Sequence, residues 1–315
     1  MASAAKKLVV CGGNGFLGSR ICKFAVARGW DVTSIRYLAQ SILKLTQTHL
    51  TLLSRSGEPH WSSVSSSSTP PQWSQKVYWE CADILKPASY TALLKDADYV
   101  VHSMGILLEA DYKGVISGRE SPIAGLRKAF SSAPRPSANP LERGATSAAD
   151  LRPPESSGNG GSQQMTYEIM NRDSAILLAR LAAEQSAEAF CYVSAAGGAP
   201  VLPSRYITTK REAEEVIARE FPSMRGVFVR PPIMYDSARP VTVGLAAATG
   251  AGALFNTITG GVLKGFMGSA GVKPLKVDVV AQAVVEALSD ESVKGPVEVP
   301  ELEALAAKSW RKNML

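Results

Sequence analysis

The chain has 315 residues, of which 45% are hydrophobic and 20% are charged, and its formal net charge at pH 7 is +6. This composition excludes a disordered tail, a fibre and a mini-protein, and is typical of a chain that buries a core. The first 60 residues carry eight of the 34 basic residues but two of the 28 acidic ones, which suits a phosphate-bearing ligand or an anionic surface. No basic stripe interleaved with aromatic residues is found, so we expect no nucleic acid partner.

Strands and helices are predicted to alternate along most of the chain. Short apolar runs bounded by turns predict strands at residues 7–11, 31–35, 76–82, 98–103, 190–194 and 226–230. Apolar residues at helical spacing predict helices at residues 16–28, 89–95, 166–186, 207–220 and 276–288, the last with an N-cap at Asp278. This order predicts an α/β fold with a doubly wound parallel sheet of the Rossmann type.

Three stretches interrupt this order. Residues 62–68 contain six serines, and residues 117–164 are rich in proline and glycine, so both are predicted to be low-complexity surface loops. Residues 36–53 separate the second strand from the Ser-Arg-Ser-Gly segment at 54–57, which by composition would follow that strand directly. We interpret residues 36–53 as an insertion, and one hypothesis for its origin is translation of an unspliced intron.

Cysteine and histidine are few and widely spaced. The four cysteines form no Cys-x-x-Cys pair and the three histidines are far apart, so we expect buried, reduced thiols and no metal site. Residues 1–10 run directly into the first strand, which leaves no room for a secretory signal peptide. Import into mitochondria would need an internal or very short signal.

A glycine-rich turn joins the first strand to the first helix and reads Gly12-Gly13-Asn14-Gly15-Phe16-Leu17-Gly18. Gly12 permits the tight turn, Gly15 lets the backbone approach a pyrophosphate, and Gly18 lets the helix pack closely. The helix N-terminus then faces the negative charge of the ligand. The place of this turn between a strand and a helix predicts dinucleotide binding, in preference to a turn that is merely tight.

Arg55 is the candidate for selecting between the two nicotinamide cofactors. It would follow the second strand if the insertion loops out, and no acidic residue stands there to hold a ribose 2′-hydroxyl. A guanidinium at this position favours a 2′-phosphate, so NADP is predicted in preference to NAD, with an ordinary surface arginine as the alternative. Asp83, after the third strand, would either contact the adenine edge or cap the following turn.

Tyr206 and Lys210 are four residues apart at the start of a predicted helix, so their side chains share one face. A neighbouring ammonium lowers the pKa of a phenol from about 10, which would let Tyr206 act as general acid or base on a carbonyl or hydroxyl. Ser194 ends the fifth strand, where open sheets bind ligands, and would orient the substrate oxygen. The alternatives are an exposed ring beside a solvated lysine and, for Ser194, a turn hydroxyl.

These motifs resemble those of the short-chain dehydrogenase/reductase superfamily, in its extended and atypical branch. The resemblance covers nearly the whole chain, through the glycine turn, Asp83, Val100-Val101-His102-Ser103, Asn171, Ser194, Tyr206, Lys210 and Arg230-Pro231-Pro232. More narrowly, GGNGFLGSRIC, ADILKPASY, VVHSMGILLE, YEIMN and YITTKREAE look like the fungal mitochondrial family associated with coenzyme Q biosynthesis. That family is similar in turn to the NADPH-binding accessory subunit of respiratory complex I.

The resemblance implies roles for single residues. Tyr206 would donate the proton, Lys210 would hold the nicotinamide ribose, Ser194 would orient the substrate, and Asn171 would support a proton relay. The cofactor site that the resemblance implies consists of Gly12, Asn14, Gly15, Phe16, Leu17, Gly18, Arg55, Asp83, Ile84, His102, Lys210 and Arg230. Met104-Gly105 and the long loop depart from the pattern of related enzymes, as does the 36–53 insertion.

The resemblance also implies an organisation and a location. Residues 1–235 would form the NAD(P)-binding domain, and residues 236–315 a small C-terminal cap over the substrate. Residues 240–263 are uncharged and long enough to span a bilayer, but they are rich in glycine and threonine. An apolar cap or a membrane-resting surface is therefore predicted in preference to a spanning helix, and a buried core segment is a further alternative.

Three functions follow as hypotheses. The first is an NAD(P)-dependent oxidoreductase on the matrix side of the mitochondrial inner membrane, which acts on a lipid-like quinone precursor together with other coenzyme Q biosynthesis proteins. The second is a non-catalytic NADP-binding assembly factor of the coenzyme Q synthesis complex or a complex I-like assembly. The third is a nucleotide-sugar epimerase or similar enzyme, for which polar pocket walls would be the sign.

Overall fold

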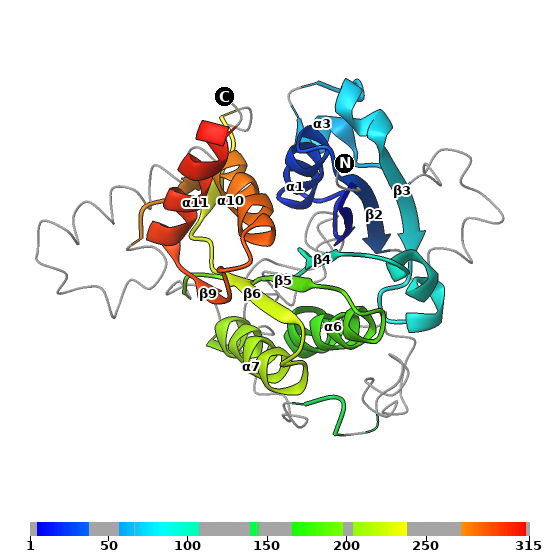
Figure 1. Cartoon of the computed structure of the whole chain (residues 1–315). Coiled ribbons are helices and arrows are strands. Elements are labelled where there is room, and N and C mark those ends of the chain that lie inside the picture. The colour runs from blue at the N-terminus through cyan, green and yellow to red at the C-terminus, as the bar shows by residue number, and fades with distance from the viewer. Residues whose placement is uncertain are drawn as a thin grey trace, which may run out of the picture.

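The computed structural model describes residues 5–37, 57–65, 67–106, 139–142, 144, 166–197, 204–237 and 272–312. Within these residues, seven strands form one sheet of parallel neighbours in the order β3-β2-β1-β4-β5-β6-β9 (Figure 1). The strands are β1 (Lys7–Cys11), β2 (Asp31–Tyr37), β3 (Val77–Ala82), β4 (Tyr99–His102), β5 (Ala189–Val193), β6 (Arg225–Val229) and β9 (Gly295–Val297). The order runs outward from β1 and β4 in both directions, which confirms the predicted doubly wound α/β fold.

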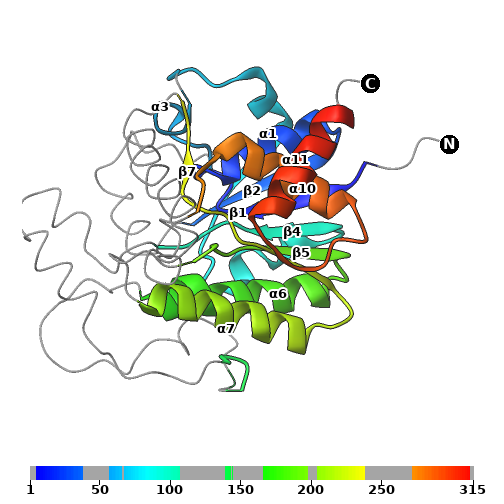
Figure 2. The same ribbon diagram turned by 90° about the vertical axis from the view of Figure 1, so that its left-hand side faces the viewer.

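Helices cover both faces of the sheet (Figure 2). One face carries α1 (Gly18–Ala27), α10 (Val277–Ser289) and α11 (Val299–Lys312), and the other carries α6 (Ser174–Glu184) and α7 (Ser204–Glu220). The shorter elements are α3 (Trp61–Val64), the 3₁₀ helices η1 (Gln72–Lys76), η2 (Pro87–Ser89) and η3 (Thr91–Leu94), the π-helix η4 (Glu168–Asp173), and the separate pair β7 (Met234–Tyr235) and β8 (Leu275–Lys276).

The sequence of β1 explains why helices are needed on both faces. Leu8 and Val10 point into the core under α1 and α10, whereas Val9 and Cys11 point into the core under α6 and α7. All four are fully buried, because side chains alternate between the faces of a strand and parallel sheets bury both faces. A continuous apolar run such as KLVVC is the expected pattern for a strand at the centre of such a sheet.

The helix predicted at residues 89–95 is replaced by the two 3₁₀ segments η2 and η3. The backbone N–H of Leu93 donates to the carbonyl of Tyr90, three residues earlier, as 3₁₀ geometry requires. Asp96 has a φ of 58° and ends the segment. The predicted α-helix is therefore wrong, and the stretch forms two short 3₁₀ turns.

Two other helix predictions differ in detail. The helix predicted over residues 166–186 begins with the π-helix η4 and continues as α6. The N-cap of α10 is Lys276, so Asp278 lies in the first turn of the helix and not at the cap. There its carboxylate is 3.4 Å from Nε of Arg20 on α1, which gives it an ion-pair partner across the helix interface.

The serine-rich segment is not wholly a loop, because its first part forms α3. Trp61 and Val64 are buried there, and the ring of Trp61 packs edge-on against Trp73 at 5.7 Å and Trp79 at 5.8 Å. The buried side chains of Trp61 and Val64 thus hold α3 in place, although the many serines around them predicted a loop. Nearly all of the predicted loop at residues 117–164 lies outside the described residues.

The predicted insertion begins later than residue 36. Arg36 and Tyr37 continue β2 and pair with Cys81 and Ala82 of β3, whereas residues 38–56 lie outside the described residues. Gly57 then packs against the backbone of Glu80, so close that a Cβ at position 57 would overlap the carbonyl oxygen. The chain therefore re-enters the described fold beside β3.

Part of the predicted C-terminal cap belongs to the main sheet. Over residues 275–312, β9 pairs with β6, and α10 and α11 cover the face that α1 also covers. Val280, Val284 and Leu288 form a buried stripe on α10, which must lie against the sheet to be covered. Residues 238–271, which contain the uncharged stretch, lie outside the described residues.

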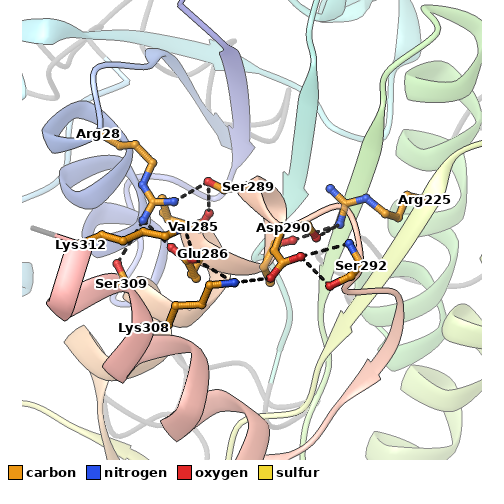
Figure 3. A network of polar contacts seen from close by, with 11 residues as sticks. Arg28, Arg225, Val285, Glu286, Ser289, Asp290, Ser292, Lys308, Ser309 and Lys312 are labelled. Atoms are coloured by element: carbon orange, nitrogen blue, oxygen red, sulfur yellow. Dashed lines mark hydrogen bonds and ion pairs between the residues drawn. The ribbon is translucent and has the colours of Figure 1, made fainter.

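A polar network joins α1, α10 and α11 (Figure 3). The fully buried carboxylate of Glu286 accepts hydrogen bonds from Nη2 of Arg28 at 2.7 Å and from Nζ of Lys312 at 2.6 Å. Lys308 lies 3.7 Å from the same carboxylate and 2.5 Å from Asp290. These contacts fix the C-terminal helix against the first helix of the chain.

Two further findings concern the thiols and the membrane. Cys11, Cys22 and Cys191 are buried free thiols and Cys81 is a half-buried one, which agrees with the expected reduced state. Burial raises the pKa of the Cys191 thiol to about 12, so it stays protonated. In the part of the chain that the structure describes, no helix has both the length and the apolar character needed to cross a membrane.

Candidate active site

The glycine turn leaves β1 and enters α1, and it has no room for a side chain at Gly12, Gly13 or Gly18. Gly12 has a φ of 90°, and a Cβ there would meet Met104 Cγ at 2.8 Å and Ser103 Oγ at 2.9 Å. A Cβ on Gly18 would overlap the carbonyl oxygen of Gly12, so the helix can start here only with glycine. The backbone N–H of Gly15 donates to Gly12 at 2.9 Å, which closes the turn.

The start of α1 fits a phosphate group. The first turn of the helix contains no acidic residue, and its backbone N–H groups carry partial positive charge. Asn14, Gly15 and Phe16 are half-buried at this end, whereas Leu17 is buried in the core. A Cβ added to Gly15 would meet a single heavy atom within 4 Å, Gly12 O at 3.1 Å, so a ligand can approach the backbone closely.

A cavity of about 350 Å³ lies at the carboxyl edge of the sheet, next to this turn. Its polar lining side chains are Ser103, Ser194, Tyr206 and Lys210. The other lining residues are apolar, and they are Phe16, Met104, Gly105, Ile106, Val193, Ala195, Gly197, Pro231, Pro232, Ile233 and Met234. The structure therefore brings Ser194, Tyr206 and Lys210 together in one apolar cavity beside the glycine turn, where doubly wound sheets bind ligands.

Lys210 is buried on α7 at the base of this cavity. Its Nζ donates to the carbonyl of Val193 at 3.0 Å and lies 5.2 Å from the ring centre of Tyr192 and 5.6 Å from that of Tyr206. Burial lowers the pKa of Lys210 to about 7, and Glu214 offsets part of this effect. A lysine that is partly neutral at physiological pH is typical of a functional site.

Tyr206 stands on the same face of α7, one turn before Lys210. Burial raises its pKa to about 12, the opposite direction to the one predicted from sequence. The reason is that burial of the phenol outweighs the positive charge of Arg211, which acts to lower the pKa of Tyr206. Among the described residues the Tyr206 hydroxyl has no hydrogen-bond partner, so a ligand oxygen can bind to it.

Ser194 follows β5 and is held by main-chain and side-chain bonds. Its backbone N–H donates to Val229 at 2.7 Å, and its Oγ accepts a hydrogen bond from Nη1 of Arg211 at 2.8 Å. Sequence reasoning missed Arg211, although its position next to Lys210 and three residues before Glu214 placed it on α7 near the cavity. The Ser194 hydroxyl is thus part of an ordered contact and not a free turn hydroxyl.

Asn171 lies in η4 and holds the wall of the cavity in place. Its Oδ1 accepts from the N–H of Ile106 at 2.9 Å, and its Nδ2 donates to the carbonyl of Ile106 at 3.2 Å. The hydroxyl of Tyr192 donates to the backbone carbonyl of Asn171. A π-helix disturbs the regular helical ladder, and such segments occur often at functional sites. The relay role of Asn171 stays a prediction.

The remaining candidates make internal contacts. His102 is fully buried with Nε2 2.9 Å from Ser174 Oγ, and burial lowers its pKa to about 3.

Asp83 caps its own turn, because its side chain accepts a hydrogen bond from the N–H of Leu85 at 3.1 Å. This contact fits the capping alternative. The next residue, Ile84, is fully buried. Arg230 forms ion pairs with Glu214 and, at 2.6 Å, with Glu298. Their predicted cofactor contacts stay predictions.

The end of β2 offers another arginine for a 2′-phosphate. Arg55 lies outside the described residues, whereas Arg36 is half-buried in the last part of β2. Its positive charge lowers the pKa of Cys81 on β3, although burial raises that pKa more strongly. The sequence analysis placed Arg36 in the insertion because the second strand was predicted to end at residue 35. The strand continues to Tyr37, so Arg36 lies near the carboxyl edge of the sheet.

Comparison with known proteins places the chain in a family. No family model matches it. MIOREX complex component 2 of Saccharomyces cerevisiae is 38% identical to it over 250 residues, which are 74% of this chain and 74% of the yeast protein. A short-chain type dehydrogenase/reductase from Mycobacterium ulcerans has a TM-score of 0.50 at 14% identity and covers 96% of this chain and 91% of its own.

The fold comparison extends to a second solved structure. The terminal R domain from the myxalamid PKS-NRPS biosynthetic pathway has a TM-score of 0.50 at 13% identity, over 95% of this chain and 66% of that one. At such identities the likeness is one of fold, and the fold is the one that the motifs predicted. The chain belongs to the family of yeast MIOREX complex component 2.

Proposed function

We propose that the chain is an NAD(P)-dependent oxidoreductase that reduces or oxidises an oxygen-bearing carbon of a lipid-like quinone precursor. The observation that carries this proposal is the meeting of Ser194, Tyr206 and Lys210 in an apolar cavity beside the glycine turn. Polar groups that converge in a mainly apolar cavity are the pattern of a site that orients one reacting oxygen.

The cofactor proposal rests on the turn and on α1. The open approach to Gly15 and the helix start without acidic residues fit a pyrophosphate, and Gly12 and Gly18 are demanded by the backbone. An arginine near the end of β2, either Arg36 within the strand or Arg55 later in the chain, would favour NADP over NAD. When bound, a nicotinamide cofactor supplies or accepts hydride.

The residues of this chain would manage the proton and the substrate oxygen. Tyr206 carries its proton at neutral pH because its pKa is about 12, so it would donate that proton to an oxygen that gains negative charge. Lys210, held by Val193, would bind the ribose hydroxyls and stabilise the phenolate that Tyr206 leaves behind. Ser194 would hold the substrate oxygen in place.

The substrate and location follow from the cavity and the family resemblance. The apolar lining suits an isoprenoid-bearing ring better than a nucleotide sugar, whose hydroxyls would need polar walls. Together with the motifs shared with the coenzyme Q-associated family, this supports a role in ubiquinone biosynthesis. The proposed site of action is the matrix side of the mitochondrial inner membrane, in contact with other proteins of that pathway.

A non-catalytic assembly factor is the second candidate. The name of the yeast relative describes a component of a complex, and such a component need not turn over a substrate. In this case the bound nucleotide would stabilise the folded state that binds the partner proteins.

Variants of Tyr206 separate the two candidates. NADPH oxidation is measured with a benzoquinone that carries a short isoprenoid tail, for wild type, Tyr206→Phe and the exposed control Tyr78→Phe. For an oxidoreductase, Tyr206→Phe lowers the rate by about 10²–10⁴-fold while NADPH binding and the control stay unchanged. If Tyr206→Phe supports quinone synthesis as well as wild type does, in cells from which this protein has been deleted, that result would contradict the enzyme and favour the assembly factor.

A further inference from the structure

Tyr206 lies in the first turn of α7, where an α-helix is held least firmly. It is the third residue of the helix, and the first four N–H groups of an α-helix have no acceptor within the helix. Such ends fray unless something outside the helix holds them. Lys210, one turn further on, has its own contact with the carbonyl of Val193. The position of Tyr206 in the cavity therefore depends on what packs against the start of α7.

An ion pair joins this helix start to η4. Arg205, the residue before Tyr206, binds the carboxylate of Glu168, the first residue of η4. Nη2 of Arg205 donates to Oε2 at 2.6 Å and to Oε1 at 2.8 Å, and Nε donates to Oε1 at 3.1 Å. The exposed fractions of the two side chains are 14% for Arg205 and 10% for Glu168. A guanidinium that binds both oxygens of a largely buried carboxylate is fixed in direction as well as in distance.

Tyr167 connects this ion pair to the ring of Tyr206. Tyr167 is fully buried, and its ring centre is 5.7 Å from Cζ of Arg205. The ring of Tyr206 packs edge-on against the ring of Tyr167, with 6.0 Å between the ring centres and an angle of 69° between the planes. The ring of Tyr206 and the backbone just before it are therefore held by the same cluster of side chains.

The ion pair is also one that neither partner can leave without cost. Burial raises the pKa of Glu168, but the hydrogen bonds that it accepts, chiefly from Arg205, lower the pKa below its ordinary value. Removing one partner of such a pair leaves the other charge buried without compensation. Loss of Glu168 should therefore draw Arg205, and the first turn of α7 with it, toward solvent.

We propose that Glu168 and Arg205 are positioning residues, whose ion pair holds the first turn of α7 against η4 and so keeps the Tyr206 hydroxyl at the reacting oxygen. This inference rests on the proposed oxidoreductase function and adds to it two residues that act through Tyr206. The same helix η4 carries Asn171, which holds Ile106 in the cavity wall. The ion pair thus connects the proton donor to the element that shapes the cavity.

The exposure of Tyr206 to solvent tests this proposal in cofactor-free protein, without turnover. Tyrosine is isotopically labelled at its ζ carbon, each NMR signal is assigned by replacing that tyrosine with phenylalanine, and a soluble gadolinium chelate broadens the signals of exposed rings. Fully buried Tyr192 and Tyr78, which is 68% exposed, mark the ends of the scale. In Glu168→Gln and in Arg205→Gln, the broadening of Tyr206 should rise at least about twofold toward that of Tyr78, while Tyr192 stays protected.

Three further variants assign the effect to this ion pair. Glu212→Gln removes another ion pair between η4 and α7, in which Glu212 Oε2 is 2.8 Å from Nη1 of Arg172, and it should leave Tyr206 as in wild type. Combining Glu168→Gln with Arg205→Gln should broaden Tyr206 no more than the single changes do. Arg205→Lys keeps the charge but not the fork, so it should give an intermediate broadening, and it decides the question if the glutamine variants do not fold.

The kinetics of the same variants separate positioning from cofactor binding. With the benzoquinone probe, Glu168→Gln should lower kcat by about 10²-fold, as expected when a reacting group is displaced by about 1 Å. The KM for NADPH should stay unchanged, because Lys210 keeps its contact with Val193. A wild type without turnover would contradict the proposed function, and the tyrosine signals would still decide this inference.

Four outcomes would overturn the proposal. The first is a Tyr206 that stays as protected as in wild type when the ion pair is removed, and the second is an equal exposure in Glu212→Gln. The third is exposure of Tyr192 together with Tyr206, because the ion pair would then support the fold in general. The fourth is an unchanged kcat in an active variant whose Tyr206 has become exposed.

Discussion

Lys210 is a buried amine whose burial has a measurable thermodynamic consequence. In an unfolded chain a lysine keeps its proton up to a pH of about 10.4, whereas the folded chain releases it near pH 7. Between these values the unfolded state binds more protons, so the free energy of unfolding rises with pH. Below pH 7 both states are protonated and the contribution no longer changes.

Replacing Lys210 by Met should remove this pH dependence. Relative to Lys210→Met, the unfolding free energy of wild type should rise by roughly 2 kcal/mol between pH 7 and 9. Urea unfolding at several pH values measures it. Lys273→Met is the control, because Lys273 lies exposed beside Glu303, and its curve should run parallel to that of wild type. Parallel curves for Lys210→Met as well would mean that Lys210 titrates as in water.

Spacing predicted which residues meet, but not how burial changes them. Tyr206 and Lys210 share a helix face by their four-residue separation, and Ser194 joins them because it ends a neighbouring strand. The rise in the pKa of Tyr206 depends on how deeply α7 sits, which no local pattern encodes. Arg211 and Asn171 act through contacts with Ala195 and Ile106, whose approach depends on the packing of α7 and η4.

At the scale of elements, the turn between β1 and α1 was predictable because glycine there has a local cause. Gly12 has a positive φ, and a Cβ at position 18 would overlap the Gly12 carbonyl oxygen. Both positions therefore require glycine, which can be recognised in the sequence. The π-helix η4 and the 3₁₀ segments left no such mark, because residues of these types also form ordinary α-helices. β2 was predicted two residues short, since Arg36 and Tyr37 break the apolar pattern but still pair with β3.

Gly18→Ala tests the turn. The added Cβ overlaps the Gly12 carbonyl, so the turn must open, and we expect NADPH affinity to fall at least about tenfold and stability by about 1–3 kcal/mol. Gly29→Ala is the control. Alanine is strained at the φ of 81° found at position 29, but its Cβ would have no neighbour within 4 Å. It should cost about 1 kcal/mol in stability and leave NADPH affinity unchanged. Equal affinities for both variants would show that the turn does not hold the nucleotide.

At the scale of the whole molecule, the C-terminal helices complete the sheet domain. β9 is three residues long and contains Gly295 and Pro296, so no strand pattern announces it, and α11 could be placed only once β9 was known to join β6. Glu286 then links α10 to α1 and α11 (Figure 3). The ends of the chain thus stabilise one another across the face opposite α6 and α7.

Glu286→Gln should weaken this link. Arg28 and Lys312 hold the pKa of Glu286 below its ordinary value, so its contribution is present at neutral pH and is lost as the pH falls through the acid range. We expect the variant to lose about 2–4 kcal/mol at pH 7, and the difference from wild type to shrink on acidification. Thermal and urea unfolding at pH 7 and in acid measure this. Glu303→Gln, in an exposed pair with Lys273, should change stability by less than about 1 kcal/mol. A constant difference at all pH values would exclude a charged Glu286.

Nucleotide binding is the property on which the proposed chemistry depends, and a fluorescence titration of the full chain with NADPH and NADH measures it directly. We predict saturable binding of both, about tenfold tighter for NADPH if, as proposed, Arg36 or Arg55 pairs with the 2′-phosphate. Gly18→Ala should lose this binding while Gly29→Ala keeps it. If wild type binds neither nucleotide, the glycine turn and the Ser194, Tyr206 and Lys210 cavity do not form an NAD(P)-dependent active site.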